Sequence, residues 1–153
     1  MKLLKYVQVQ SRCASIDKYQ ISFINFHLMN KESNNYNLQT RTTDFSKEII
    51  NLCKTTKSDI VNNTIIDQLV RSGTSIGANY MEAINGSSKK DFKNKIFICK
   101  KEAQETKYWL EMLKESDSDQ TELINKLSQE CHELNLIFQK TINTLVVNMK
   151  INT

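Results

Sequence analysis

Apolar residues recur every three or four positions from about residue 43 onward, which is the spacing of helices with one buried face. The pattern predicts four helices. Each begins at a residue whose side chain can cap a helix or after a polar break, at Thr43 or Asp44, at Ser58 or Asn62, at Ser88, and after residues 116–119. Asn85-Gly86 is a typical stop signal for the second helix. Four amphipathic helices with short connections predict an all-α fold, an antiparallel up-down-up-down four-helix bundle.

The expected core is the apolar stripe of each predicted helix. In chain order its members are Phe45, Ile49, Leu52, Ile66, Leu69, Gly73, Ile76, Tyr80, Ala83, Phe92, Ile96, Cys99, Ala103, Thr106, Leu110, Leu113, Ile124, Leu127, Cys131, Leu134, Phe138, Ile142, Leu145 and Met149. A chain of 153 residues is long enough to bury such a core without disulfide cross-links.

The first 38 residues have no sustained period and include an asparagine-rich polar stretch. We expect residues 1–38 to be an N-terminal extension that is poorly ordered, or to include residues that precede a true start of translation at Met29. The bundle is expected to span residues 39–153.

Composition favours helices over strands, because the chain has no proline, three glycines and 25% charged residues. The four cysteines are too scattered to bind zinc and are typical of buried thiols in a reducing cytoplasm: Cys13, Cys53, Cys99 and Cys131. We expect neither a signal segment nor a membrane span, because no apolar run is long enough for either. The net charge of +4 permits contact with nucleic acid without requiring it.

Gly73 and Gly77 lie one turn apart inside the second predicted helix, where each costs about 1 kcal/mol relative to alanine. We interpret them as a place of close packing, where a neighbouring helix approaches the backbone. The alternative interpretation is a backbone surface exposed to a ligand.

Three sequence blocks have the wording, order and spacing of a known family. They are QLVRSGTSIGANYMEA at residues 68–83, SKKDF at residues 88–92 and ETKYWL at residues 105–110. Over residues 41–148 the chain resembles the four-helix-bundle proteins encoded in intervening sequences of bacterial 23S ribosomal RNA genes. The resemblance implies the bundle fold, a ring-shaped homopentamer and a basic, nucleic-acid-binding surface, and it implies no catalytic site. Relatives in diversity-generating retroelements act as accessory subunits of a reverse transcriptase.

The third predicted helix carries more apolar surface than one buried stripe uses. The surplus residues are Phe97, Ile98, Tyr108, Trp109 and Met112. We expect them to form the contact between copies in a ring, whose two complementary patches need not look alike. The alternative is that the N-terminal extension or a long fourth helix covers them within one chain.

Positive charge gathers at the start of the same helix, where residues 88–101 contain six lysines and one acid. Lysine is a flexible point charge that suits phosphate contact without reading bases. The predicted nucleic-acid contacts are Lys89, Lys90, Lys93, Lys95, Lys100, Lys101 and Lys107. Four lysines recur every seven residues along one edge of this helix: Lys93, Lys100, Lys107 and Lys114. The alternative is a solvated face with ordinary pairs such as Lys101 and Glu105.

Polar residues also interrupt the apolar helices, at Arg71, Asn79, Glu82, Glu102 and Glu105. We expect a structural network that fixes helix register, in which Arg71 pairs with a glutamate and the Asn79 amide bridges two helices.

Catalytic and metal sites are not predicted. A di-iron site in a bundle needs two Glu-x-x-His units, whereas His27 lies outside the bundle and His132 has Gln129 three residues before it. A nucleophile paired with a base and a phosphate-binding loop are also missing from the sequence. We therefore expect a non-enzymatic protein without cofactor or metal. Two functions stay open, namely RNA or DNA binding by a homo-oligomer, for example of ribosomal RNA, and assembly with a protein such as a reverse transcriptase.

Overall fold

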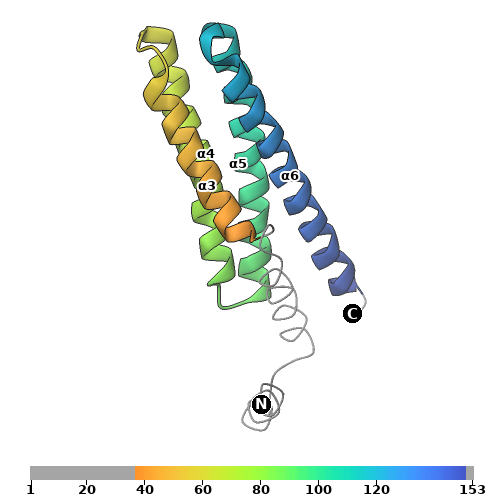
Figure 1. The fold of residues 1–153 in the computed structure, drawn as a ribbon. Coiled ribbons are helices and arrows are strands. Elements are labelled where there is room, and N and C mark those ends of the chain that lie inside the picture. Colours follow the sequence, from red (N-terminus) through yellow and green to blue (C-terminus); the bar gives the residue numbers. More distant parts are fainter. Residues whose placement is uncertain (1–36, 151–153) are drawn as a thin grey trace, which may run out of the picture. The chain divides into compact units, whose positions relative to one another are not determined.

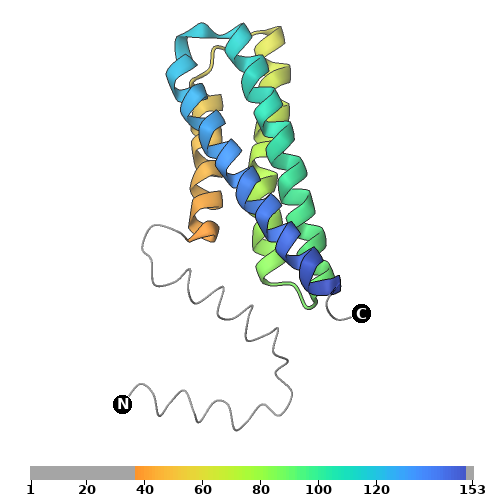
Figure 2. The same ribbon diagram turned by 90° about the vertical axis from the view of Figure 1, so that its right-hand side faces the viewer.

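The computed structural model describes residues 37–150, and over this range the chain is helical without strands. The helices are α3 (Leu38–Thr55), α4 (Ile60–Ile84), α5 (Lys89–Ser116) and α6 (Thr121–Lys150), with a short 3-10 turn, η1 (Ser118–Gln120), before the last. Figure 1 and Figure 2 show the four long helices gathered into one bundle. The prediction for residues 1–38 lies almost wholly outside the described residues. None of the described helices has an apolar stretch long enough to cross a bilayer.

The caps of two helices are clear. Ser88 begins α5 as predicted, because its hydroxyl accepts the backbone N–H of Asp91. The cap of α4 is Asp59, whose carboxylate accepts two backbone N–H groups of the first turn. The predicted caps Ser58 and Asn62 were therefore wrong by one and three positions. Asn62 is instead buried in the first turn and donates to the backbone oxygen of Lys57.

Helix α3 begins at Leu38, five residues before the predicted cap Thr43. Thr42 and Thr43 do not cap the helix, because their hydroxyls form hydrogen bonds inside it. Thr43 donates to the backbone oxygen of Gln39, and Thr42 donates to the same oxygen. Asp44 is exposed and pairs with Lys47 along the same helix. Side chains that could have capped a helix are thus accommodated inside one.

The core follows the predicted stripes closely. The side chains that are less than 2% exposed include Ile49, Leu52, Leu69, Ile76, Ile96, Leu110, Leu113, Ile124, Leu127, Leu134 and Phe138. Two predicted core residues, Ile66 and Leu145, are not fully buried, and Ile65 is buried in α4 in place of Ile66. Ile65 continues the row of residues spaced by four that includes Leu69 and Gly73. Leu145 is half-buried, and the side chain of Met149 lies outside the described part of the structure.

Helix α5 packs between α4 and α6. The Cys99 thiol approaches the backbone oxygen of Ile76 in α4 at 3.5 Å, and the Cys131 thiol of α6 donates to the backbone oxygen of Ala103 at 3.0 Å. Burial raises the pKa of both thiols to about 12, so neither is a thiolate near neutral pH. These cysteines therefore serve as small core residues.

The two glycines of α4 lie where α3 approaches most closely. A Cβ atom on Gly77 would lie 2.9 Å from Ser46 Oγ and 3.2 Å from the backbone oxygen of Thr42. On Gly73 it would lie 2.9 Å from a methyl carbon of Ile49. The Ser46 hydroxyl also reaches the backbone oxygen of Gly73, at 3.3 Å. The structure therefore accounts for both glycines by close helix packing.

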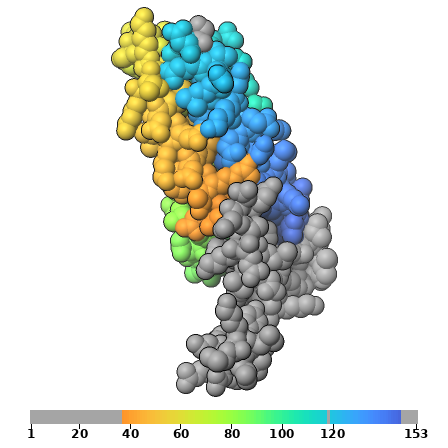
Figure 3. Space-filling view, in the orientation of Figure 1, coloured from red at the N-terminus to blue at the C-terminus, as the bar shows by residue number. Residues whose placement is uncertain are grey.

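A charged cluster joins α3 to α6, which lie side by side on the face shown in Figure 3. The guanidinium of Arg41 donates two hydrogen bonds to the Glu130 carboxylate, of 2.5 and 2.8 Å, and one to Glu133. Further along, Lys126 pairs with Glu48 at 3.4 Å. Forked contacts of this kind between arginine and carboxylates fix orientation as well as distance.

Gly77→Ala is expected to destabilise the bundle by about 1 kcal/mol, although alanine is the better helix former. The new methyl group would press on the Thr42 backbone, which cannot move away as a side chain can. Urea denaturation measures this change. Adding Ser46→Ala to Gly77→Ala should recover part of the loss, because it removes the nearest atom. An increase in stability for Gly77→Ala alone would contradict the close approach of α3.

Glu133→Gln is expected to lower stability at neutral pH and to have no effect in strong acid. The hydrogen bond from Arg41, helped by one from Gln129, holds the pKa of Glu133 below its ordinary value. A carboxylate with a lowered folded-state pKa contributes stability above its unfolded pKa, near 4.3, and loses it as the pH falls through the folded value. Thermal melts from pH 7 to pH 2 measure this. Glu111→Gln, at an exposed position of α5, is the control and should leave the curve unchanged.

Candidate nucleic-acid interface

One edge of α5 carries a row of lysines, defined as Lys93, Lys100, Lys107 and Lys114. Residues seven apart fall on the same side of a helix, so these four side chains share one edge. Lys114 donates to the side-chain oxygen of Asn125 in α6, at 2.8 Å. The lysine row therefore runs along the side of α5 that faces α6.

Helix α6 places an uncharged polar row beside these lysines, which sequence reasoning missed. Asn125 contacts Lys114, and the positions that follow it at spacings of three and four continue along the same side of α6. They are Ser128, His132, Asn135 and Gln139. No acid occurs in this row. The sequence shows the spacing of this row. It does not show that the row lies beside α5.

Lys95 lies on the opposite edge of α5. Its ammonium forms an ion pair with Glu82 of α4 and lies 3.4 Å from the side-chain oxygen of Asn79. Lys95 is thus paired with an acid of the same chain, and it does not belong to the candidate interface. Four of the other predicted contacts are exposed, namely Lys89, Lys90, Lys101 and Lys107. The remaining two, Lys93 and Lys100, are half-buried.

The edge that contains Lys95 continues as a mixed apolar and acidic row along α4. Ile98, Trp109 and Met112 recur there with Glu102 and Glu105, and all five are half-buried. The indole nitrogen of Trp109 is buried, without a hydrogen-bond acceptor in the part of the chain that the structure describes. The polar edge of this ring therefore points inward, and mainly carbon remains at the surface.

Phe97 and Tyr108 form part of a third row, which points away from the rest of the bundle. Their side chains are 44% and 51% exposed. The Lys93 ammonium lies over the Phe97 ring, 5.9 Å from its centre, while Tyr108 contacts the Trp109 ring edge to face at 4.9 Å. The structure thus divides the five predicted interface residues into an α4 edge, Ile98, Trp109 and Met112, and an outer pair, Phe97 and Tyr108.

Of the expected polar network, residues 37–150 show the part around Lys95. Asn79 donates to the backbone oxygen of Ser75 and accepts from Lys95, so its amide links α4 to α5. Arg71 is exposed and makes no ion pair within residues 37–150, so the expected pair with a glutamate is absent there. The reason is rotational: position 71 falls on the outer side of α4.

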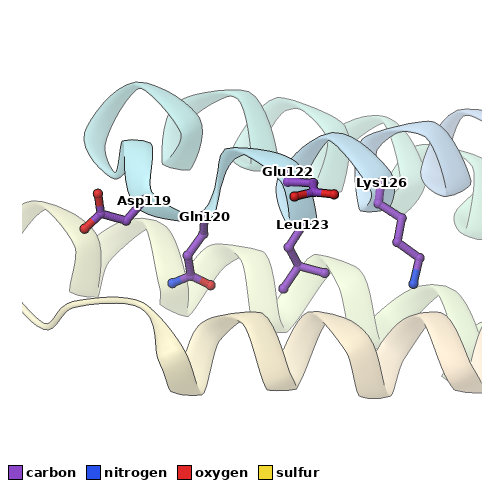
Figure 4. Close-up of a pocket in the computed structure, with 5 residues that line it drawn as sticks. All are labelled: Asp119, Gln120, Glu122, Leu123 and Lys126. Atoms are coloured by element: carbon purple, nitrogen blue, oxygen red, sulfur yellow. The ribbon is translucent and has the colours of Figure 1, made fainter.

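Two surface hollows lie elsewhere, both beside α6. Figure 4 shows the one at the start of α6, where Gln120, Leu123 and Lys126 point towards α3. The side-chain oxygen of Gln120 accepts a hydrogen bond from the Thr55 hydroxyl, at 2.9 Å. The other hollow is lined by the charged cluster of Arg41. Within the described residues, no group of three or more His, Cys, Asp or Glu side chains is placed to hold a metal ion.

Comparisons with known proteins agree with this fold. A crystal structure at 1.70 Å of a protein with unknown function from the S23 ribosomal protein family, from Bacteroides thetaiotaomicron, is 35% identical. It matches 68% of this chain and 96% of its own, with a TM-score of 0.61. No curated protein matches. The profile of the 23S rRNA-intervening sequence protein matches residues 34–140. The chain therefore belongs to the 23S rRNA-intervening sequence protein family.

Proposed function

We propose that this protein is a non-enzymatic, cytoplasmic nucleic-acid-binding protein, which contacts the phosphates of structured RNA or of DNA through the lysines of α5. The observation that carries the proposal is the lysine row, bordered on α6 by a polar row without acids. Phosphate contacts of this kind give affinity without sequence selection. The family name adds ribosomal RNA as a candidate ligand.

The distribution of charge along α5 favours a contact at its N-terminal half. Residues 89–101 hold six lysines and one acid, whereas residues 102–116 hold two lysines and four glutamates. The N-terminus of a helix is also the positive end of its dipole. The predicted contacts in this lysine-rich half are Lys89, Lys90, Lys93, Lys100 and Lys101.

The second part of the proposal is assembly of the up-down-up-down bundle into a ring-like homo-oligomer, a pentamer by the resemblance given above. Support comes from the α4 edge, where Ile98, Trp109 and Met112 present carbon surface that the bundle covers only in part. The lysine row lies on the other side of α5, so this contact would leave it accessible. Repetition around a ring would add many weak phosphate contacts together.

The same α4 edge supports a second candidate function. Half-buried apolar residues flanked by Glu102 and Glu105 also suit contact with a different protein, such as a reverse transcriptase. In that case the protein would be an accessory subunit without a nucleic-acid role. Binding of labelled RNA and DNA distinguishes the two candidates.

Replacing Lys93, Lys100 and Lys101 together by glutamine is expected to weaken binding to all sequences alike. Each lost phosphate contact removes about 0.7–0.9 from the slope of log affinity against log salt, so the slope should fall by about 2 to 3. Fluorescence anisotropy at several salt concentrations measures it.

The control for this triple change removes the same charge elsewhere. Lys47, Lys54 and Lys57 are exposed on α3 and the turn after it. Their replacement by glutamine also lowers the net charge from +4 to +1, yet it should leave the slope nearly unchanged. Equal effects of the two triple variants would show that net charge alone matters, and would refute the α5 interface.

Trp109→Glu is expected to dissociate the ring, because a carboxylate at this carbon surface would have to be desolvated on assembly. Light scattering should show the mass falling towards 17.8 kDa, that of one chain, while circular dichroism retains the helical signal. Leu136→Glu, at an exposed apolar position of α6, is the matched control and should leave the mass unchanged. A parent protein that is monomeric at high concentration would exclude the ring itself.

A further inference from the structure

We propose that Phe97 is a stacking platform for an unpaired base, and that the nucleic acid bound by α5 is single-stranded where it crosses this residue. The inference rests on the proposed nucleic-acid function and names the class of ligand. It reassigns Phe97, which the sequence had suggested as a contact between copies.

The first argument is the position of the ring. Phe97 belongs to the outer row of α5, which runs through Lys90, Asn94, Phe97, Lys101 and Gln104 at spacings of three and four. Its side chain is 44% exposed, while Ile96 beside it in the sequence is 1% exposed. The bundle therefore has no need of the Phe97 ring for its core.

The second argument is the charge around the ring. Lys93 lies over the ring, 5.9 Å from its centre. Lys100 and Lys101 follow Phe97 by three and four residues, so they lie one helical turn away on the same side. An aromatic ring between lysines suits a base and its phosphates, since the base stacks on a ring face and the ammonium groups meet the phosphates on either side. An apolar partner surface would gain nothing from these charges and would have to desolvate them.

The third argument separates single strands from duplexes. In a duplex the bases are stacked on one another, so a ring reaches a base face only where a base step is unstacked, which costs a few kcal/mol. Recognition of single-stranded nucleic acid uses aromatic stacking on a positively charged surface, which tolerates any sequence. A duplex could still touch the lysines, but the cost of unstacking would offset what it gains from Phe97.

Tyr108 serves as an internal comparison. It lies eleven residues further along the same outer row and is 51% exposed. Its ring already contacts Trp109 edge to face, and Glu105 and Glu111 lie three residues to either side of it. Negative charge beside the ring disfavours an approaching phosphate chain. Tyr108→Ala should therefore change binding far less than Phe97→Ala.

The experiment compares a labelled single strand of about 16 nucleotides with a duplex of about 16 base pairs at one salt concentration. Phe97→Ala is expected to weaken binding of the single strand roughly 5- to 100-fold and to leave duplex binding within about twofold, because duplex binding rests on phosphate contacts alone. Phe97→Leu keeps the apolar bulk without the π-face and should behave like Phe97→Ala. Phe97→Trp should bind as tightly as the parent or more tightly. Leu136→Ala, which removes another exposed apolar side chain, is the control.

The outcomes are distinguishable from those for the proposed function. Equal loss for the single strand and the duplex would overturn stacking and leave the phosphate interface standing. Parental affinity of Phe97→Leu for the single strand would also overturn the stacking proposal, because leucine has no aromatic face on which a base can stack. A fall in oligomer mass for Phe97→Ala would return Phe97 to the contact between copies. If the parent binds neither ligand at low salt, the proposed function fails and this inference fails with it.

Discussion

The rotation of α5 about its own axis decides which residues each side of this helix presents. Its buried stripe, which runs from Phe92 to Leu113, packs between α4 and α6 and cannot turn without exposing the core. Thiols on either side, Cys99 against Ile76 and Cys131 against Ala103, lie in the same contacts. Once the stripe is fixed, helical geometry assigns the remaining residues to three rows. The lysine row faces the α6 side, the row that contains Phe97 and Tyr108 faces outward, and Lys95 lies on the α4 side with the apolar and acidic residues.

These three rows would allow the two proposed contacts to share one helix. A contact between copies through Ile98, Trp109 and Met112 would use the α4 side and leave the lysine row uncovered. Ion pairing keeps the sides distinct, because Lys95 on the α4 side is paired with Glu82. A lysine row with acids on both neighbouring helices would instead be neutralised by them. The absence of acids from the adjoining polar row of α6 is therefore as important to the proposed interface as the lysines themselves.

The sequence predicted the core well, because burial obeys the same period that defines the helix. It also identified Ser88 as a cap and the glycines of α4 as a packing site. It could not place the start of α3, since Thr42 and Thr43 satisfy their hydroxyls within the helix and so resemble caps only in composition. Nor could it find the contact of Arg41 with Glu130, which joins residues 89 positions apart. Such contacts depend on how the helices are rotated relative to one another. The spacing of apolar residues within one helix does not determine that rotation.

The division of the surplus apolar residues shows why this limit matters for function. In the sequence, Phe97 and Ile98 are adjacent and equally apolar, so one explanation served for both. In the structure, a single step along the helix separates a half-buried side chain on the α4 side from an exposed ring beneath Lys93. An exposed phenylalanine costs free energy by holding apolar surface in water, and nearby lysines make it a poor place for another protein to dock. A ligand that carries both flat apolar faces and negative charge resolves that conflict, and nucleic acid with unpaired bases is such a ligand.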